Sequence, residues 1–260
     1  MRIALGVEYN GSGFHGWQIQ ENLITLQRTL ENALSKVAAE SVTVICAGRT
    51  DAGVHATNQV VHFETSAERD LRAWIQGTNS YLPRSISVKW AQVVDEAFSA
   101  RFSAISRRYQ YFIYNNDVRS SLYSSMTTWV RRSLDETQMD AASKFLIGEH
   151  DFSSFRSADC QSRTPKRHVF AVNVSRRNEL VILDIIANSF LHHMVRNIAG
   201  VLIEIGEGRK ETEWCKELIS VKNRSLASKT APPFGLYLTG VRYPDHYALP
   251  CDFRSPFFNG

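Results

Sequence analysis

Residues 42–65 read VTVICAGRTDAGVHATNQVVHFET, and this stretch predicts two β-strands that flank a polar loop. The first strand is the β-branched run Val42–Cys46, and the second is Asn58–Thr65, whose apolar residues are valine and phenylalanine. The loop between them combines glycine, aspartate and threonine, as turns do. A turn alone does not account for Arg49 two residues before Asp51, so the loop is a candidate functional segment.

The segments on either side of this stretch complete the order β-α-β-β-α-β, which is typical of a ferredoxin-like unit. Upstream, Ile3–Tyr9 predicts a strand, and the apolar spacing within Leu26–Val37 predicts a helix with Thr25 as its N-cap. Downstream, Leu71–Leu82 predicts a helix that ends before a proline, and Ile86–Val94 predicts a further strand.

The second half of the chain repeats that order without visible sequence repetition. Its predicted elements are, in chain order, the strand Arg108–Tyr114, the helix Leu134–Ile147, the strands Val169–Val174 and Leu180–Ile186 with a hairpin turn at Asn178, the helix Ser189–Ile205, a shorter helix around Trp214 and Leu218, and the strand Leu236–Tyr243. We therefore predict an α+β protein of two ferredoxin-like units, whose antiparallel or mixed sheets meet around a central cleft. The expected domains are residues 1–98 and 108–243, with a linker at 99–107 and an irregular tail at 244–260.

The composition is that of an ordinary soluble globular protein, with 43% hydrophobic and 22% charged residues. Residues 1–10 lack the basic and apolar regions of a secretory signal, and no apolar run is long enough to span a bilayer. We therefore expect a cytoplasmic protein without a membrane segment. The cysteines are scattered, which favours reduced thiols over a disulfide framework or a zinc site; they are Cys46, Cys160, Cys215 and Cys251.

The net charge is only +4, which permits a polyanionic partner without demanding one. The basic residues are grouped, however. A single group is typical of a solvated face, but several groups near aromatic residues favour nucleic acid as a partner. The groups are Arg107–Arg108, Arg131–Arg132, Arg176–Arg177, and Arg163 with Lys166 and Arg167.

The segment Gly11–Gly16 fits the pattern G-x-G-x-x-G directly after a predicted strand, as in dinucleotide-binding proteins. In that motif the third glycine opens a helix whose N-terminus meets the pyrophosphate. Here the helix begins only near Thr25, and no acidic residue stands at the end of a second parallel strand. We therefore expect no nicotinamide cofactor, and interpret the segment as either a flexible loop or a loop that touches RNA backbone.

Besides the loop Ala47–Ala56, several further segments stand out along the chain: Phe14 with Gly16–Gln18 and Gln20, Ala100–Ala104 with Arg108–Tyr109, Gly148–Phe152, Phe190–Asn197, and Thr230–Pro233 with Gly235–Leu238. In the same order, these segments resemble motifs of the bacterial tRNA pseudouridine synthase A family. The loop Ala47–Ala56 is similar to the catalytic motif of that family. The resemblance extends from about Tyr9 to Pro244 and implies the pseudouridine synthase fold.

This resemblance implies an isomerase that converts uridine to pseudouridine at positions 38, 39 and 40 of the tRNA anticodon stem-loop, without cofactor or metal. Asp51 would be the catalytic carboxylate, kept ionised by Arg196, and would either attack the ribose or abstract a sugar proton. Tyr109 would stack on the extruded uracil and join proton transfer, and Leu236 would pack under the base. Arg49 would fill the space that the flipped uridine leaves, or else pair with the catalytic carboxylate.

The same resemblance implies a homodimer that binds tRNA, and it places Arg101, Arg108 and His193 among the substrate-binding residues. His192 and His193 are neighbours on a predicted helix and would point roughly 100° apart, so they do not form the i, i+4 pair of a zinc helix. Two other functions stay open. A non-catalytic tRNA-binding protein of the same fold would bind tRNA in a salt-dependent way but form no product. A nicotinamide-dependent oxidoreductase would bind a dinucleotide and ignore tRNA.

Overall fold

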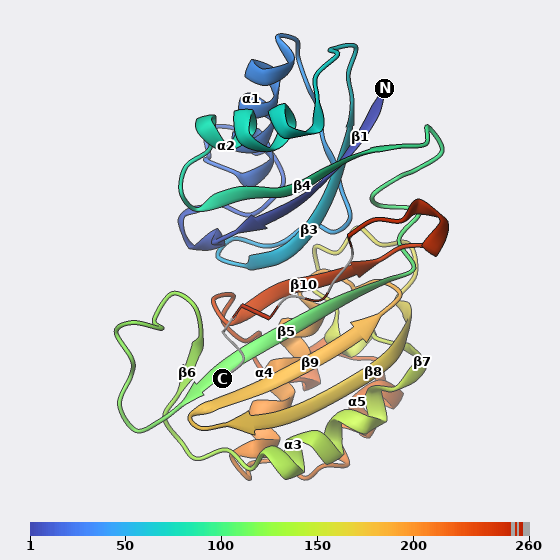
Figure 1. Cartoon of the computed structure of the whole chain (residues 1–260). Coiled ribbons are helices and arrows are strands. Elements are labelled where there is room, and N and C mark those ends of the chain that lie inside the picture. Colours follow the sequence, from blue (N-terminus) through green and yellow to red (C-terminus); the bar gives the residue numbers. More distant parts are fainter. Residues whose placement is uncertain (251–252, 254, 257–260) are drawn as a thin grey trace. The chain divides into compact units, whose positions relative to one another are not determined.

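The computed structural model describes residues 1–250, 253, 255 and 256, and Figure 1 shows the course of the chain. The chain forms two compact units. Unit 1 consists of Met1–Arg107 and Tyr237–Gly260, and unit 2 consists of Arg108–Leu236. In the described part of the chain, no helix has the length and apolar character needed to cross a membrane.

Unit 1 contains a sheet with the strand order β4-β1-β3-β10, in which β2 also pairs with β3. Strand β1 is antiparallel to both β3 and β4, β2 is antiparallel to β3, and β10 runs parallel to β3. The strands are β1 (Arg2–Tyr9), β2 (Ile45–Cys46), β3 (His55–Glu64), β4 (Ile86–Val94) and β10 (Leu236–Arg242). The predicted β-α-β-β-α-β order of the first unit is therefore confirmed.

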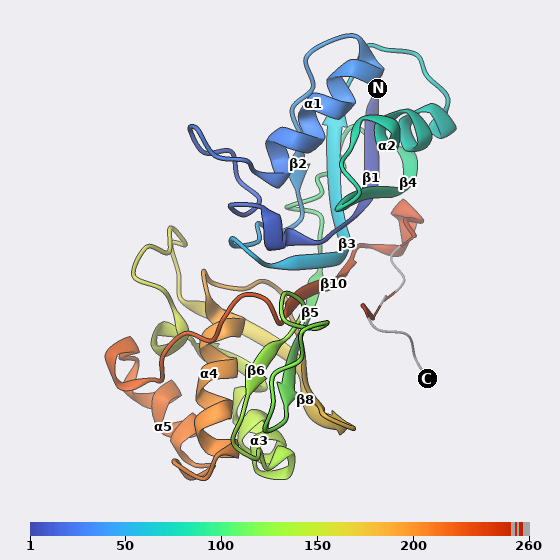
Figure 2. The same ribbon diagram turned by 90° about the vertical axis from the view of Figure 1, so that its left-hand side faces the viewer.

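Two helices of unit 1, α1 (Leu26–Ala38) and α2 (Thr78–Tyr81), pack against each other, as Figure 2 shows. Helix α1 buries four residues of the apolar stripe that its spacing predicts, namely Leu26, Leu30, Ala33 and Leu34, while Val37 is only half-buried. Thr25 occupies the N-cap position, but its side chain makes no capping hydrogen bond. Helix α2 follows a π-helical turn, Ala73–Gly77, which buries Trp74 completely. The second predicted helix is thus present but irregular.

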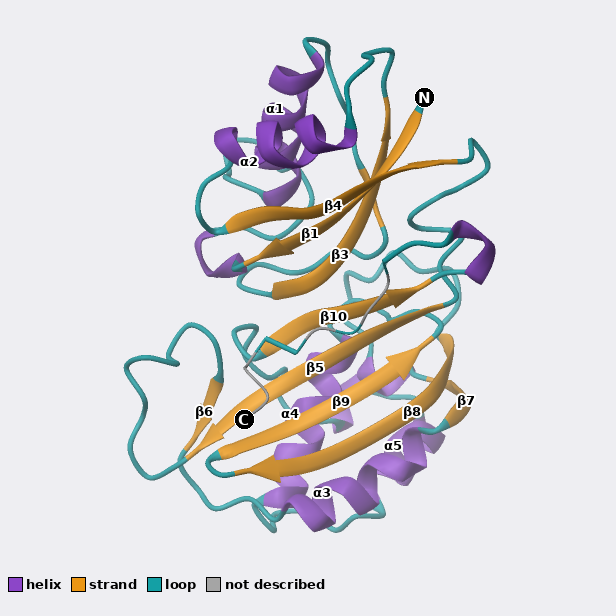
Figure 3. Ribbon diagram, viewed as in Figure 1, coloured by secondary structure: helices purple, strands orange, loops and turns teal. Residues whose placement is uncertain are grey.

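Unit 2 contains a sheet with the strand order β5-β9-β8-β7, and the short β6 lies parallel to β5 (Figure 3). Strands β8 and β9 form an antiparallel hairpin, and Asn178 in its turn adopts a left-handed φ of 52°. Alternate residues of β9 are buried, as expected for a strand with one covered face. The strands are β5 (Ser106–Asn115), β6 (Thr128–Val130), β7 (Gly148–Asp151), β8 (Lys166–Arg177) and β9 (Leu180–Ala187).

The helices of unit 2 are α3 (Glu136–Ser143), α4 (Met194–Gly206) and α5 (Trp214–Val221). Helix α3 packs against both α4 and β8. Its N-cap is Asp135, whose carboxylate accepts the backbone N–H groups of Thr137 and Gln138. Most residues of α4 are buried, so α4 is the central helix of this unit.

Two features of unit 2 differ from the sequence prediction. Strands β6 and β7 were not predicted, because three and four residues are too few to show a recognisable alternation. The helix expected from Ser189 begins only at Met194. The reason is that His193 adopts a φ of 62°, in the left-handed region that a right-handed helix does not contain. The segment 189–193 is therefore non-helical.

The division into units also differs from the expected domain boundaries. Residues 99–107, expected to be a linker, belong to unit 1. One reason is that the Ala100 N–H donates to Nδ1 of the buried His62 on β3, at 3.0 Å. The chain from Tyr237 onward also belongs to unit 1, since Tyr237 and Leu238 pair with β3.

The segment expected to be an irregular tail begins with ordered structure. Asp245–Tyr247 forms a 3-10 turn, and the Tyr247 carbonyl accepts a hydrogen bond from Gln92 at 3.0 Å. Cys251 lies outside the described residues. The other three cysteines are buried free thiols; they are Cys46, Cys160 and Cys215.

The buried His62 makes the stability of unit 1 depend on pH. Burial lowers the pKa of His62 to about 4, and the positive charge of Arg2 adds to the effect. The unfolded chain takes up this proton near pH 6.5 and the folded chain only near pH 4. Between these values the unfolded state binds more protons, so the stability that the neutral imidazole contributes above pH 6.5 is lost as the pH falls towards 4.

We expect His62→Asn to reduce this pH dependence, because asparagine keeps an acceptor for the Ala100 N–H but does not titrate. The measurement is the urea midpoint of both proteins at neutral pH and at mildly acidic pH. The wild type should lose more stability on acidification than the variant. An identical loss in the two proteins would contradict the account of His62.

Candidate active site

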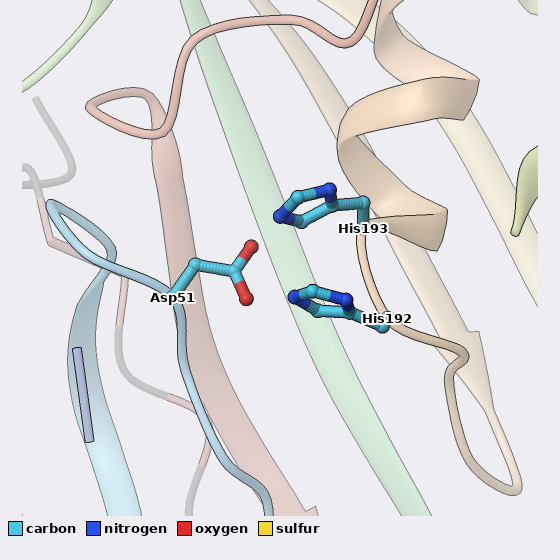
Figure 4. Close-up of side chains that lie close together, drawn as sticks. All are labelled: Asp51, His192 and His193. Atoms are coloured by element: carbon cyan, nitrogen blue, oxygen red, sulfur yellow. The ribbon is translucent and has the colours of Figure 1, made fainter. Parts of the chain in front are cut away.

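The loop between β2 and β3 carries Asp51, and we call residues 47–54 the Asp51 loop. The Asp51 side chain is half-buried and extends from this loop in Figure 4. On either side of it the backbone is hydrogen bonded: the Thr50 carbonyl accepts the N–H of Trp17 at 2.9 Å, and the Asp51 carbonyl accepts the N–H of Val54 at 3.1 Å. The loop is therefore a fixed turn rather than a free connection.

The glycine segment Gly11–Gly16 packs directly on the Asp51 loop. A Cβ at Gly11 would lie 1.9 Å from the carbonyl oxygen of Val54, and a Cβ at Gly16 would lie 3.0 Å from that of Thr50. Gly16 also has a φ of 84°, which favours glycine. The glycines thus let two backbones touch. The segment opens with a 3-10 turn and no helix starts at its third glycine, so the structure agrees with the rejection of a dinucleotide-binding loop.

Buried side chains hold the first residues of the Asp51 loop. Arg107 is 9% exposed, and its Nε and Nη2 donate to the Ala47 carbonyl at 3.2 and 3.0 Å. Gln59 on β3 is completely buried, and its Nε2 donates to the Gly48 carbonyl at 2.6 Å. The position of Asp51 is therefore set by the core of unit 1. Sequence analysis named Arg107 only as part of a basic pair and did not name Gln59, since the sequence around an arginine or a glutamine carries no signal of its burial.

Two exposed guanidinium groups, those of Arg49 and Arg101, lie near the start of this loop. Burial raises the pKa of the Cys46 thiol to about 12, and the charges of Arg49 and Arg101 both oppose that rise. Both positive charges therefore act on the same thiol. Within the described part of the chain, neither arginine pairs with a carboxylate. Both can thus receive an anionic ligand.

In unit 2, the candidate tyrosine is Tyr109 on β5. It is 7% exposed, and its ring meets that of Phe190 edge-on, with the centroids 5.0 Å apart. Tyr111, two residues further on, is completely buried, and its hydroxyl donates to the Pro232 carbonyl at 2.8 Å. Burial raises the pKa of Tyr111. Tyr111 is thus committed to the core of unit 2.

Arg196 lies in the first turn of α4 and is half-buried. Its Nε donates to the Ala231 carbonyl at 2.9 Å, and the Ala231 N–H donates back to the Arg196 carbonyl at 3.2 Å. The adjacent Asn197 is buried, and its Oδ1 accepts from the Thr230 hydroxyl at 2.7 Å and from Arg224 at 3.0 Å. These bonds fix the guanidinium stem of Arg196. In the sequence, only their place in the motif segments indicated that Asn197 and Thr230 matter to the site.

Leu236 opens β10 and is 6% exposed. The preceding Gly235 lies against β5: a Cβ there would be 2.4 Å from the Phe112 carbonyl, and the Phe112 N–H donates to the Gly235 carbonyl at 2.8 Å. Unit 2 therefore holds Leu236 together with Tyr109 and Arg196. Unit 1 holds the other set of predicted residues, which are Arg49, Asp51 and Arg101.

His192 and His193 lie immediately before α4, so the argument from helical spacing was wrong for them. Their rings lie side by side, as Figure 4 shows. The two ring centroids are 3.9 Å apart. The backbone N–H of His192 donates to the Cys160 sulfur at 3.4 Å. The two imidazoles by themselves supply fewer ligands than the four of a structural zinc site.

The pair Arg107–Arg108 is not the solvated basic face that such a pair suggests by itself. Arg107 is buried, as described above. Arg108 forms a two-pronged ion pair with Asp184, in which its Nε donates to Oδ1 at 2.8 Å and its Nη2 to Oδ2. Arg176, in another basic pair, likewise bonds Glu136 at 2.8 Å. These arginines stabilise the fold as well as contributing positive charge.

We expect Gly11→Ala to destabilise the protein, because the new methyl group would overlap the Val54 carbonyl and displace the Asp51 loop. Overpacking of this kind costs about 1–3 kcal/mol, which corresponds to a melting temperature lower by about 2–12 °C in a chain of this size. Calorimetry measures this shift. Gly13→Ala is the matched control, since no atom lies within 4 Å of its Cβ position. Equal effects of the two changes would contradict this packing role.

Comparison with known proteins agrees with the motif resemblance. A family model described as tRNA pseudouridine synthase matches residues 6–103 and 142–244. The protein named tRNA pseudouridine synthase A from Legionella pneumophila (strain Lens) is 53% identical over 258 residues, which cover 99% of this chain and 98% of that one. The proteins of the same name from Shewanella frigidimarina (strain NCIMB 400) and Coxiella burnetii (strain Dugway 5J108-111) are each 52% identical to this chain. Each similarity covers 99% of this chain, together with 99% of the Shewanella protein and 98% of the Coxiella protein. The chain therefore belongs to the tRNA pseudouridine synthase family.

Proposed function

We propose that this protein isomerises uridine to pseudouridine at positions 38, 39 and 40 of the tRNA anticodon stem-loop, without a cofactor. The observation that carries the proposal is similarity over 99% of the chain to relatives named tRNA pseudouridine synthase A. The Asp51 loop adds support. It presents a carboxylate from a backbone that the core of unit 1 already holds in place.

The reaction breaks the bond between N1 of uracil and C1′ of the ribose. The uracil turns while still bound, and its C5 then bonds to C1′. The proton lost from C5 balances the proton gained at N1, so no atom enters or leaves. We assign Asp51 as the catalytic carboxylate, which either attacks the ribose or removes a sugar proton, and both roles require its ionised form. Arg196 is the proposed cation that favours this form.

Tyr109 and Leu236 are the proposed contacts to the target uracil. Tyr109 would stack on the base and take part in proton transfer during the rearrangement, and Leu236 would pack against it. Their surroundings in unit 2 support these roles. Phe190 supports the Tyr109 ring at its edge, and the hydrogen bond between Gly235 and Phe112 fixes the backbone before Leu236.

The remaining residues are proposed to bind the RNA. A uridine in a stem must leave its stack before any group reaches C1′, at a cost of a few kcal/mol. Arg49, exposed and without a carboxylate partner among the described residues, would fill the vacated space. Arg101 and His193 would contact RNA backbone. Arg108 would have to share its guanidinium between the RNA and Asp184.

We further propose that the protein acts in the cytoplasm as a homodimer, as the family resemblance implies. Light scattering on the purified protein measures its mass in solution. A mass twice that of the 29.5 kDa chain would support the dimer, and a mass of one chain would exclude it.

Asp51→Ala should abolish pseudouridine formation while leaving tRNA affinity within a few-fold of wild type. Loss of a group that moves protons in the transition state lowers the rate by about 10²–10⁴-fold, and loss of a nucleophile lowers it at least as much. The assay incubates wild type and variant with unmodified tRNA and no cofactor. Carbodiimide-blocked reverse transcription then maps the pseudouridines.

The other outcomes of this assay decide between the alternatives. Product from both proteins would remove Asp51 from its role. tRNA binding without product from the wild type would favour the non-catalytic binder, and product outside positions 38–40 would overturn the assigned sites. Arg196→Ala should reduce the rate by itself but add nothing to Asp51→Ala, since the proposed purpose of Arg196 is the charge of Asp51.

A further inference from the structure

Phe102 is the most exposed aromatic side chain in the described part of the chain, with 80% of its surface accessible. A single exposed apolar residue is ordinary in a folded protein. Three features distinguish Phe102 from other exposed residues. They are the hydrogen-bonded backbone that carries it, the cation beside its ring, and the link between its turn and the Asp51 loop.

The turn that carries Phe102 is stabilised by hydrogen bonds within the turn and by hydrogen bonds to buried side chains. The Ser103 N–H donates to the Ser99 carbonyl at 2.9 Å, and the Ser99 N–H donates to the Ser103 hydroxyl at 3.0 Å. The Ala100 carbonyl accepts the buried Tyr243 hydroxyl at 2.7 Å, in addition to the bond from Ala100 to His62. A backbone held at this many points presents the phenyl ring outward in a preformed position, so little entropy is lost when a ligand binds it.

A guanidinium group lies beside the ring. The Arg101 guanidinium carbon is 5.1 Å from the centroid of Phe102, within the range of a cation–π contact. The buried Arg107 links this turn to the Asp51 loop, because it donates to the carbonyls of both Arg101 and Ala47. The backbone that carries the exposed aromatic ring and its cation is therefore tied to the Asp51 loop within unit 1.

We infer that Phe102 stacks on an unpaired base of the tRNA substrate while Arg101 binds an adjacent phosphate. An aromatic face next to an unpaired guanidinium is the combination that binds single-stranded RNA. Bases inside a paired stem are covered by their neighbours, so only an unpaired or terminal base offers a free face. The flanking Arg101 and Ser103 are polar, which suits RNA better than an apolar protein interface. This inference rests on the proposed function, and Phe102 acts as a positioning residue that does not touch the reacting atoms.

Phe102→Ala should raise the Kd for unmodified tRNA by about tenfold, and Phe102→Tyr should restore binding because tyrosine keeps the aromatic face. In turnover, Phe102→Ala should raise KM while kcat at saturating tRNA changes little. Its melting temperature should match that of wild type, because the ring is exposed. Stacking releases no counterions, so the dependence of affinity on salt should not change. Arg101→Ala should reduce the slope of log affinity against log salt by about one.

Tyr81→Ala is the matched control. Tyr81 is 53% exposed and has the Lys36 ammonium group 4.9 Å from its ring centroid, but it lies on α2. Its removal should leave tRNA affinity unchanged. The inference is overturned if Phe102→Ala binds like wild type, if Phe102→Tyr fails to restore binding, or if Tyr81→Ala causes an equal loss. If the wild type forms pseudouridine and Phe102→Ala binds tRNA normally, only the proposed stacking contact is rejected. If the wild type neither binds nor modifies tRNA, the proposed function is rejected together with this contact.

Discussion

The direct contact between two stretches of backbone, the Gly11–Gly16 segment and the Asp51 loop, is the constraint on which the candidate site of unit 1 depends. No side chain separates them, so their spacing cannot adapt to a methyl group without moving one of them. Trp17 and Arg107 also donate hydrogen bonds to backbone carbonyls of the Asp51 loop. A carboxylate on a free loop would have to be ordered in every catalytic cycle, at a cost of about 1–2 kcal/mol per residue fixed. In this protein the Asp51 loop is already ordered when unit 1 folds, so the cost is not repeated in each catalytic cycle.

Unit 2 prepares its candidate residues by similar means. Arg196 and Ala231 exchange two hydrogen bonds, which hold the stem of the arginine against the backbone of the 230–233 segment. The Tyr109 ring is supported by Phe190, while the fully buried Tyr111 anchors the 230–233 segment through Pro232. Groups held in place in this way stabilise a transition state without further reorganisation. The proposed isomerisation, which uses no cofactor, depends on such side chains alone.

Long periodic segments were predictable from sequence. The strand predicted at Ile86–Val94 is β4, and the helix predicted across Leu26–Val37 is α1, because many residues contribute to each signal. Prediction failed where the local structure depends on a single dihedral angle, as at His193, or where a strand is very short, as in β6. The residues alone marked the Asp51 loop as unusual, and only the family resemblance gave it a chemical role. No sequence pattern could show that Gly11 faces a backbone far along the chain.

Amide hydrogen exchange measured by NMR tests most directly whether the Asp51 loop is held by the core of unit 1. The N–H groups of Trp17 and Val54 are the donors that close this loop. The account predicts that both exchange as slowly as the amides of β1 and β3, because all of them open only when unit 1 unfolds. Rapid exchange at Trp17 and Val54, with β1 and β3 still protected, would show that the loop opens by itself and would contradict the account.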